Sequence, residues 1–192
     1  MKTAVIFGSS GGIGLATVEA FLRAGYTVVP FDRTKLDLTI NSERIDGILT
    51  DLTPDVVVNC AGVFADNCAD NTMLQVNVNS NWCIIKHYIK QSTIPTKIIL
   101  VGSSAYTGGR KNYMLYSASK AALHNLWEGA RDFFADTKIG IDIVHPVRTR
   151  TAMVAPYQDT LDYLEPETVA QAILKQANQT GSSCINLTFK DV

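Results

Sequence analysis

Short runs of Val and Ile alternate with segments of helical periodicity, and this alternation constrains the fold of the chain more than any other feature. Runs such as TAVIF, DVVVN and KIILVG are shorter than helices and lack the polar alternation of a strand with one exposed face. They are typical of parallel strands that helices cover on both sides. The pattern therefore predicts an α/β fold with a doubly wound parallel sheet of about seven strands.

The expected strands and helices follow one another along the whole chain. Strands are expected at residues 3–7, 26–31, 36–39, 55–59, 97–102, 139–145 and 183–189, the third of them very short. Helices are expected at residues 13–24, from 42, at about 71–91, at 113–135 and from about 166. No repeat or linker interrupts this order, so residues 1–192 are expected to form a single domain.

Composition narrows the range of partners. Hydrophobic residues make up 46% of the 192 residues, charged residues 18%, and the formal net charge is −1, which is typical of a soluble globular protein. This balance gives no sign of binding to nucleic acid, and no apolar run is long enough to span a membrane. We expect a cytoplasmic protein without a metal, because the cysteines form no CxxC pair and no metal-like cluster (Cys60, Cys68, Cys83 and Cys184).

A glycine-rich loop joins the first strand to the first helix. Gly8, Gly12 and Gly14 are spaced so that the backbone can turn tightly and approach a pyrophosphate at the helix N-terminus. Turns also collect glycine for purely structural reasons, but the position between a strand and a helix favours a dinucleotide site. The candidate cofactor-binding residues here are Gly8, Ser10, Gly12, Ile13 and Gly14.

An acidic residue, Asp32, ends the second strand, where a carboxylate can accept hydrogen bonds from an adenosine ribose. A solvated turn residue is the alternative interpretation. Asp32 would repel a 2′-phosphate and so favours NAD over NADP. Arg33 follows at once and could stack on adenine or pair with a 2′-phosphate, so NADP remains possible.

Several further motifs occur in an order that resembles the short-chain dehydrogenase/reductase family. N-C-A-G at residues 59–62 resembles the family's N-N-A-G element, with Cys60 in place of Asn, and Val76-Asn77 resembles its V-N step. A serine doublet, Ser103-Ser104, precedes Tyr116-x-x-x-Lys120. Residues 146–153 resemble the P-G-x-x-x-T-x-M segment, with Val147 in place of Gly. The resemblance implies a Rossmann-type fold, an NAD(P) cofactor and further cofactor-binding residues: Asn59, Ala61, Gly62, Tyr116, Lys120, Pro146, Thr149 and Thr151.

The segment after the second strand also resembles the sugar-nucleotide reductases of the wider superfamily. The second helix is almost lost, and L-D-L-T would serve as a short third strand. This makes Asp37 and Leu38 candidates for contacts to the adenine. A short polar connector is nearly as good an interpretation.

The stretch YSASK places a tyrosine and a lysine four residues apart, on one face of a helix. A free tyrosine has a pKa near ~10, and a neighbouring ammonium would lower it and favour the phenolate. The family resemblance implies that Tyr116 is the acid/base, that Lys120 binds the nicotinamide ribose, and that Asn77 holds a water. The alternative is a half-buried structural tyrosine, but Tyr106 and Tyr113 nearby have no lysine four residues on.

Either serine of the doublet could hold the substrate oxygen. Ser103 lies thirteen residues before Tyr116, which is the usual family separation. Ser104 is the second serine, which is the usual family position, and is the preferred candidate.

The substrate side is locally basic, with Arg110 before Tyr116 and Arg148 and Arg150 in the Pro146 segment. Arginine forks suit phosphate or carboxylate groups, so an anionic substrate such as a phosphorylated or nucleotide-linked sugar or polyol is expected, with ordinary surface charge as the alternative. About a dozen residues separate Met153 from the next helix, which leaves little room for a lid.

The leading hypothesis is an NAD(P)-dependent oxidoreductase acting on a carbonyl/alcohol pair. An epimerase or dehydratase using transient oxidation is a second hypothesis, and a non-catalytic dinucleotide sensor is a third. The helices at 71–91 and 113–135 pair subunits in the family, which implies a homodimer or homotetramer.

Overall fold

The computed structural model describes residues 1–64, 71–155 and 162–190. Six parallel strands form one sheet in the order β2-β1-β3-β4-β5-β6. Their bounds are Thr3–Phe7 (β1), Thr27–Phe31 (β2), Val56–Asn59 (β3), Thr96–Val101 (β4), Ile139–His145 (β5) and Cys184–Asn186 (β6). The expected α/β fold with a parallel sheet is therefore confirmed.

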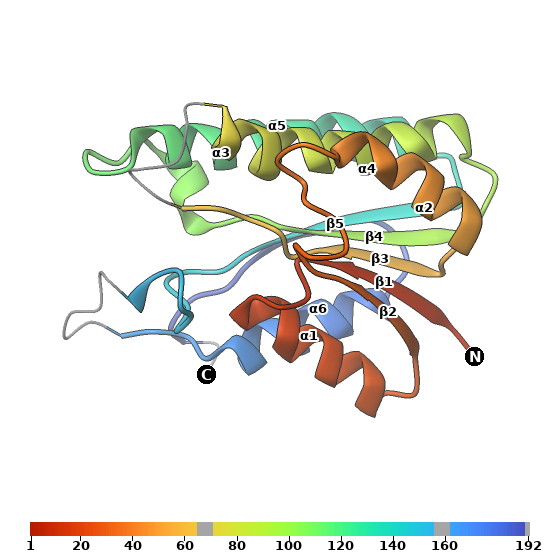
Figure 1. Ribbon diagram of the computed structural model, residues 1–192, viewed down its shortest axis with the longest axis horizontal. Coiled ribbons are helices and arrows are strands. Elements are labelled where there is room, and N and C mark those ends of the chain that lie inside the picture. The colour runs from red at the N-terminus through yellow and green to blue at the C-terminus, as the bar shows by residue number, and fades with distance from the viewer. Residues whose placement is uncertain (65–70, 156–161, 191–192) are drawn as a thin grey trace.

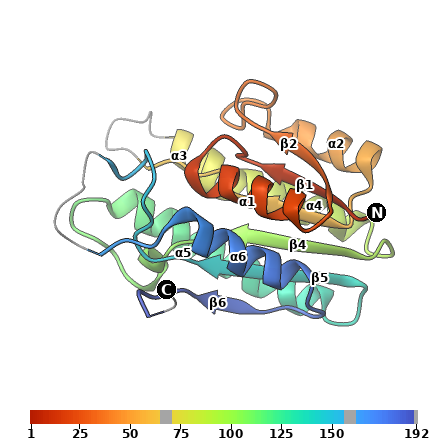
Figure 2. The same cartoon turned by 90° about the horizontal axis from the view of Figure 1, so that it is seen from below.

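Helices cover both faces of the sheet (Figure 1 and Figure 2). One face carries α1 (Gly12–Arg23) and α6 (Pro166–Ala177), and the other carries α2 (Ile45–Leu52), α3 (Thr72–Leu74), α4 (Ser80–Lys90) and α5 (Met114–Phe134). A π-helical turn, Gln75–Asn79, joins α3 to α4, so the helix expected at 71–91 forms as one continuous stretch. Helices on both faces explain why the strands are apolar on both faces.

The strand register divides the apolar residues between two cores. Val5, Val57 and Ile98 are register partners whose side chains pack against α4 and α5. The next residues along the same strands, Ile6, Val58 and Ile99, pack on the opposite face, against α1 and α6. Full burial of each such side chain contributes about 1.5–3 kcal/mol, so a slip in register would be costly.

The short strand expected at residues 36–39 does not form, so the sheet has six strands and not seven. Leu36 and Leu38 are buried in the core beside α2, which leaves the backbone between them to turn. Asp37 accepts hydrogen bonds from the N–H and the hydroxyl of Thr39, at 2.9 and 2.7 Å, and these bonds close the turn. β2 is therefore an edge strand.

The chain reverses the direction in which it adds strands between β2 and β3. β2 lies on one side of β1, and β3 lies on the other side. Ligands of open α/β sheets bind at the carboxyl ends of the strands at such a reversal point. No helix within the described ranges is long and apolar enough to cross a membrane.

Candidate active site

The loop between β1 and α1 has the tight backbone that its glycines predict. Gly8 adopts a φ of 72°, and a Cβ on it would lie 2.5 Å from the backbone nitrogen of Ala61. A Cβ on Gly14 would collide with the carbonyl oxygen of Gly8, and one on Gly12 would lie 2.6 Å from Cγ2 of Thr151. Each of the three motif positions is thus closed to a side chain.

The first turn of α1 carries no group that would compete with an anion. Its N-cap, Gly11, makes no side-chain hydrogen bond, and the turn contains no acidic residue. Backbone N–H groups at the positive end of a helix dipole bind phosphate well. The loop and the helix end therefore fit the pyrophosphate of a dinucleotide.

The N-C-A-G element after β3 packs directly against the glycine loop. Asn59 is only 1% exposed, and its Nδ2 donates to Oγ of Ser80 at 3.1 Å and to Oδ1 of Asn81 at 2.9 Å. Its Oδ1 accepts from the N–H of Ala61 at 3.0 Å. Asn59 therefore stabilises the loop that follows β3 from its buried side, while Ala61 and Gly62 are the more exposed residues of that loop.

Cys60, which replaces the family's second Asn, turns toward the other face and lies 3.8 Å from the hydroxyl of Thr17. Burial raises the pKa of its thiol to about 12. The residue is therefore an inert packing thiol between β3 and α1.

Tyr116 and Lys120 lie one turn apart on α5, at the carboxyl end of the sheet. Nζ of Lys120 is 5.7 Å from the centroid of the Tyr116 ring and donates a 3.0 Å hydrogen bond to the carbonyl of Val101, the last residue of β4. A Cβ on Gly62 would lie 3.7 Å from the same Nζ. The i, i+4 spacing thus brings a phenol and an ammonium to one place beside the loop that follows β3.

The two titratable groups are shifted in opposite directions by the same cause. Burial raises the pKa of Tyr116, although a hydrogen bond with Ser103 lowers it in part. Burial lowers the pKa of Lys120 to about 8. The pKa of Tyr116 is therefore raised and not lowered as expected, because desolvation of the phenolate is the largest influence on it.

The serine doublet separates into two roles. Ser103 is the N-cap of a 3₁₀ turn, Ser104–Thr107, and is the serine of the doublet whose hydroxyl lowers the pKa of Tyr116. Ser104 directs its N–H to the carbonyl of Pro146 at 3.0 Å. The geometry thus favours Ser103 over Ser104, against the preference that family position gave.

Asn77 lies in the π-helical turn and is fully buried. Its Oδ1 accepts from the N–H of Val63 at 2.9 Å, and its Nδ2 donates to the carbonyl of Val63 and to Oγ of Ser119, both at 3.0 Å. The amide therefore ties the loop after β3 to α5, and the water-holding role of Asn77 stays a prediction. A π-helical turn often marks a functional site. Ser119 takes part in this link through its hydroxyl.

The residues after β2 make mostly local contacts. Oδ1 of Asp32 caps a turn by accepting from Thr34 N, Thr34 Oγ1 and Lys35 N, and these bonds lower its pKa, led by that of the Thr34 hydroxyl. Nε of Arg33 lies 3.2 Å from Asp37, and Leu38 is buried in the core. Structural roles thus account for Asp37 and Leu38.

Backbone carbonyls of the Pro146 segment accept hydrogen bonds from nearby residues, and one of the segment's arginines forms an ion pair. The carbonyl of Pro146 accepts from Ser104, and Oγ1 of Thr149 donates to the carbonyl of Val147 at 3.0 Å. Arg150 forms a 2.8 Å ion pair with Glu165.

Two of the three arginines share an aromatic partner. Arg148 and Arg150 lie over the ring of Tyr163, at 6.0 and 5.4 Å from its centroid. Arg110 is exposed in the loop before α5. The structure therefore does not gather the three arginines around Tyr116.

Sequence reasoning missed the side chains that support the serine turn from behind. Nδ1 of the fully buried His145 lies 3.1 Å from the N–H nitrogen and 3.2 Å from the carbonyl oxygen of Ser103, and a Cβ on Gly102 would collide with this ring. Burial lowers the pKa of His145 to about 4, so the ring is neutral at neutral pH. His124 and Cys184 lie beside it, so the expectation that the cysteines take no part in a metal-like cluster is corrected. The only local indication in the sequence was Gly102 before the serine doublet, because a glycine can mark a place where another side chain packs against the backbone.

Comparisons with known proteins agree with this geometry. The family model described as short chain dehydrogenase matches residues 43–162. An uncharacterized oxidoreductase of Staphylococcus aureus (strain USA300) is 26% identical over 216 residues, covering 93% of this chain and 91% of the relative.

Solved structures share the fold. A short chain dehydrogenase from Burkholderia cenocepacia in complex with NADP superposes with a TM-score of 0.86 at 20% identity, covering 99% of this chain and 89% of that one. The 3-alpha-hydroxysteroid dehydrogenase from Pseudomonas sp. B-0831 complexed with NADH gives 0.82 at 21% identity, with 96% and 95% covered. Since the family model spans more than half of the 192 residues, the chain belongs to the short-chain dehydrogenase family.

Proposed function

We propose that the protein is an NAD(P)-dependent oxidoreductase that interconverts a carbonyl compound and its alcohol, with Tyr116 as the acid/base. The observation that carries this proposal is the pairing of Tyr116 and Lys120, with Ser103 against the phenol, at the carboxyl end of the sheet. Family membership and the NADP and NADH bound to structural relatives support it.

The glycine loop would hold the cofactor by its pyrophosphate. The closed positions Gly8, Gly12 and Gly14 bring backbone N–H groups to the start of α1, and the exposed Ser10 and half-buried Ile13 lie in the same turn. Tyr116 and Lys120 would bind the nicotinamide ribose, and Thr149 and Thr151 would border the ring. When bound, the nicotinamide supplies or accepts the hydride.

NAD is the proposed preference. Asp32 places a carboxylate at the end of β2, where it would accept from the ribose hydroxyls and repel a 2′-phosphate. Arg33 pairs with Asp37, which reduces its capacity to attract that phosphate.

In the reducing direction Tyr116 would donate its phenolic proton to the substrate oxygen. Its raised pKa keeps the phenol protonated at neutral pH, as a general acid requires. The Ser103 hydroxyl would hold the same oxygen, and the Lys120 ammonium would stabilise the phenolate that forms.

Two aromatic rings lie beside Tyr116. Phe64 and Tyr113 contact it, with ring centroids 4.8 and 6.2 Å away. Arg150 is already paired with Glu165. We therefore favour a carbonyl compound with an apolar substituent over the phosphorylated sugar that the arginines suggested. This preference is tested by measuring kcat/KM for matched neutral and phosphorylated carbonyl compounds. A higher kcat/KM for the phosphorylated compound would favour the anionic substrate instead.

A homodimer or homotetramer through α4 and α5 is part of the proposal. Large apolar side chains are exposed on these helices, among them Trp82, Leu115 and Phe133. Sedimentation or light scattering of the protein, and of a Trp82→Glu variant, tests this assembly.

The test of the function uses Tyr116→Phe with Tyr113→Phe as its matched control. Consumption of NADH and of NADPH is measured over a panel of carbonyl compounds, with cofactor binding measured separately. Loss of the acid/base is expected to lower kcat about 10²–10⁴-fold, while cofactor binding, which keeps the glycine loop and Lys120, is expected to weaken far less. Tyr113→Phe, which keeps its ring, is expected to stay within a few-fold of wild type.

Two outcomes would replace the proposal with its alternatives. Binding of the cofactor without turnover across the panel would favour a dinucleotide sensor. Formation of an epimer or a dehydrated product without net change in the cofactor would favour an epimerase or dehydratase.

A further inference from the structure

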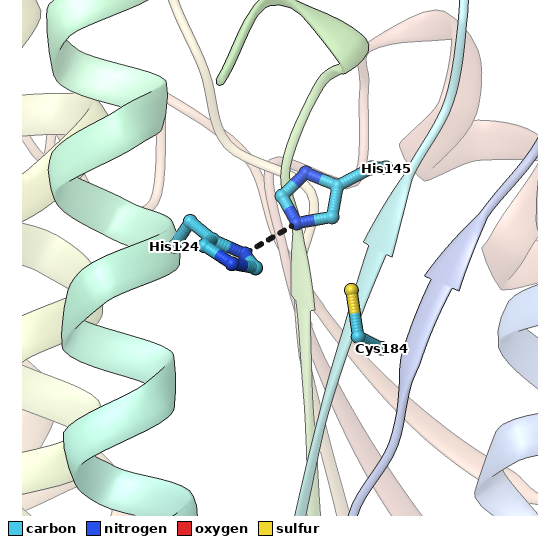
Figure 3. Close-up of side chains that lie close together, drawn as sticks. All are labelled: His124, His145 and Cys184. Carbon is cyan, nitrogen blue, oxygen red and sulfur yellow. Dashed lines mark hydrogen bonds between the residues drawn. The ribbon is translucent and has the colours of Figure 1, made fainter. Parts of the chain in front are cut away.

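Three side chains that the proposed function does not use converge behind the Ser103 turn (Figure 3). His124 comes from α5, His145 from the end of β5 and Cys184 from the start of β6. Their ligand atoms all lie within 4.8 Å of one another, and Nδ1 of His124 is 3.0 Å from Nε2 of His145. Two histidines and a cysteine are the ligand types that zinc prefers.

The outer nitrogens of the two rings face the kinds of group that usually orient a metal-bound histidine. Such a histidine usually donates the N–H of its other ring nitrogen to a carbonyl or a carboxylate. Nδ1 of His145 is 3.2 Å from the carbonyl oxygen of Ser103, and Nε2 of His124 is 3.8 Å from Oε1 of Glu128. With a hydrogen on each outer nitrogen, the lone pairs of the two inner nitrogens face each other, and a cation between them would stabilise that arrangement.

Packing holds both rings in place before any ion binds. Tyr106 stacks on His145 at 4.0 Å between centroids and lies 4.3 Å from His124. The missing side chain of Gly102 leaves the space that the His145 ring occupies. His145 is fully buried, but the His124 side chain is 20% exposed and Cys184 is partly exposed, so an ion can enter from their side.

A plain hydrogen bond between the rings would also explain the 3.0 Å separation. The thiol of Cys184 lies beside the same two rings, as Figure 3 shows, where it also packs against the apolar core and lies 3.9 Å from Nδ2 of Asn186. Zn–N bonds of about 2.0–2.1 Å and a Zn–S bond of about 2.3 Å require separations between ligand atoms of roughly 3.3–3.6 Å. The rings would part by a few tenths of an ångström, and the sulfur would move inward by up to roughly 1.2 Å.

We propose that His124, His145 and Cys184 bind one Zn²⁺ ion, with water in the fourth position. Binding releases the thiol proton of Cys184 to solvent and leaves the thiolate on the ion. It also holds His145 with its hydrogen on Nδ1, donating to the carbonyl of Ser103. Without the ion the same nitrogen can accept from the Ser103 N–H, at 3.1 Å. This coupling to Ser103 rests on the proposed function, whereas the metal site does not.

Co²⁺ is the probe for the site, because tetrahedral Co²⁺ with a thiolate ligand absorbs visibly and shows a charge-transfer band. The full chain, reduced and freed of metal by a chelator, is titrated with Co²⁺ and then with Zn²⁺. One equivalent of Co²⁺ is expected to give the thiolate band, and Zn²⁺ is expected to abolish it.

Variants assign the signal to the three residues. Cys184→Ser should remove the thiolate band, and His124→Asn should weaken Co²⁺ affinity by at least about 100-fold, since even outer residues of metal sites contribute 10–100-fold. Cys83→Ser is the matched control, because Cys83 lies on α4 outside the cluster, and it should bind like wild type. A missing thiolate band, or a band that persists in Cys184→Ser, would overturn the site.

A kinetic measurement tests the coupling separately. Zn²⁺ at one equivalent is expected to change kcat at least about 2-fold in wild type and not in Cys184→Ser. Stoichiometric binding with unchanged turnover would overturn the coupling to Ser103 and leave the site standing. Absence of any turnover would contradict the proposed function and leave the Co²⁺ result unaffected.

Discussion

Two lysines of this protein are almost fully buried, at opposite ends of the same strand. Lys97, 8% exposed, stands near the start of β4, and Lys120, 4% exposed, donates to Val101 at the end of it. Nζ of Lys97 lies 2.7 Å from Asp142 and 2.7 Å from the carbonyl of Gly181. In the described ranges no carboxylate pairs with Lys120, and its hydrogen bond goes to a backbone carbonyl.

The difference shows which buried charge serves the fold and which serves chemistry. Asp142 and Lys97 compensate each other, although burial still raises the pKa of Asp142. Lys120 carries the cost of burial without such a partner, and its pKa falls to about 8. An unpaired buried ammonium beside a tyrosine is hard to explain by stability, and perturbed groups of this kind cluster at functional sites.

Exchange of each lysine for Met gives the largest predicted contrast. Lys120→Met is expected to lower kcat/KM for carbonyl reduction about 10²–10⁴-fold, because the phenolate and the ribose lose their cation. Its melting temperature should be equal or higher, since an apolar side chain replaces an unpaired charge. Lys97→Met should retain wild-type kcat/KM per folded molecule. Steady-state kinetics and thermal unfolding of both variants check these expectations. Equal kcat/KM values for the two variants would contradict a catalytic role for Lys120 that Lys97 lacks.

Stability should show the reverse contrast. Lys97→Met leaves the carboxylate of Asp142 buried without its partner and is expected to lower the free energy of unfolding by about 3–5 kcal/mol. The double variant Lys97→Met/Asp142→Leu should recover most of this loss, because no charge then remains. Urea unfolding measures the three free energies. A double variant no more stable than the single one would show that the ion pair is not the cause.

Between pH 8 and 10.5, Lys120 should contribute to the pH dependence of stability. Its pKa is about 8 in the folded protein, and its ordinary value, which applies to the unfolded chain, is 10.5. Between these two pH values the unfolded chain therefore binds more protons than the folded protein. The free energy of unfolding of wild type relative to Lys120→Met should therefore rise with pH from about 8 to about 10.5, by about 3 kcal/mol at most. Below pH 8 the difference should be constant. Urea unfolding across this range checks it, and a constant difference up to pH 10.5 would contradict the lowered pKa.

The sequence predicted those parts of the molecule that depend on local spacing. Tyr116 and Lys120 lie on one helix, so their four-residue separation was enough to bring them together. The glycines of the first loop act within one turn, and six of the seven strands expected from the apolar runs are present.

The missed features depend on contacts between distant segments. Lys97 meets Asp142 only because β4 pairs with β5 in a particular register, with Lys97 opposite Gly140. His124, His145 and Cys184 meet for the same reason, across a helix and two strands. The strand expected at 36–39 failed because its two leucines bury against α2 while Asp37 closes a turn.

The glycines that border the two lysines give the smallest predicted contrast. A Cβ on Gly140 would lie 2.6 Å from the carbonyl oxygen of Gly181 and 3.0 Å from Cδ of Lys97. Gly140→Ala is therefore expected to cost about 1–3 kcal/mol of stability through overpacking. A Cβ on Gly62 would lie 3.6 Å from Asn77 and 3.7 Å from Lys120, which are ordinary contacts.

Gly62→Ala should accordingly change the free energy of unfolding by less than about 1 kcal/mol, since neither glycine has a positive φ and alanine restricts the unfolded chain. Urea unfolding of the two variants compares the space around each ammonium directly. Equal losses would mean that Lys120 is packed as tightly as Lys97. The smaller loss at Gly62 would instead show that the space beside Lys120 admits another group, as the binding of a nicotinamide ribose requires.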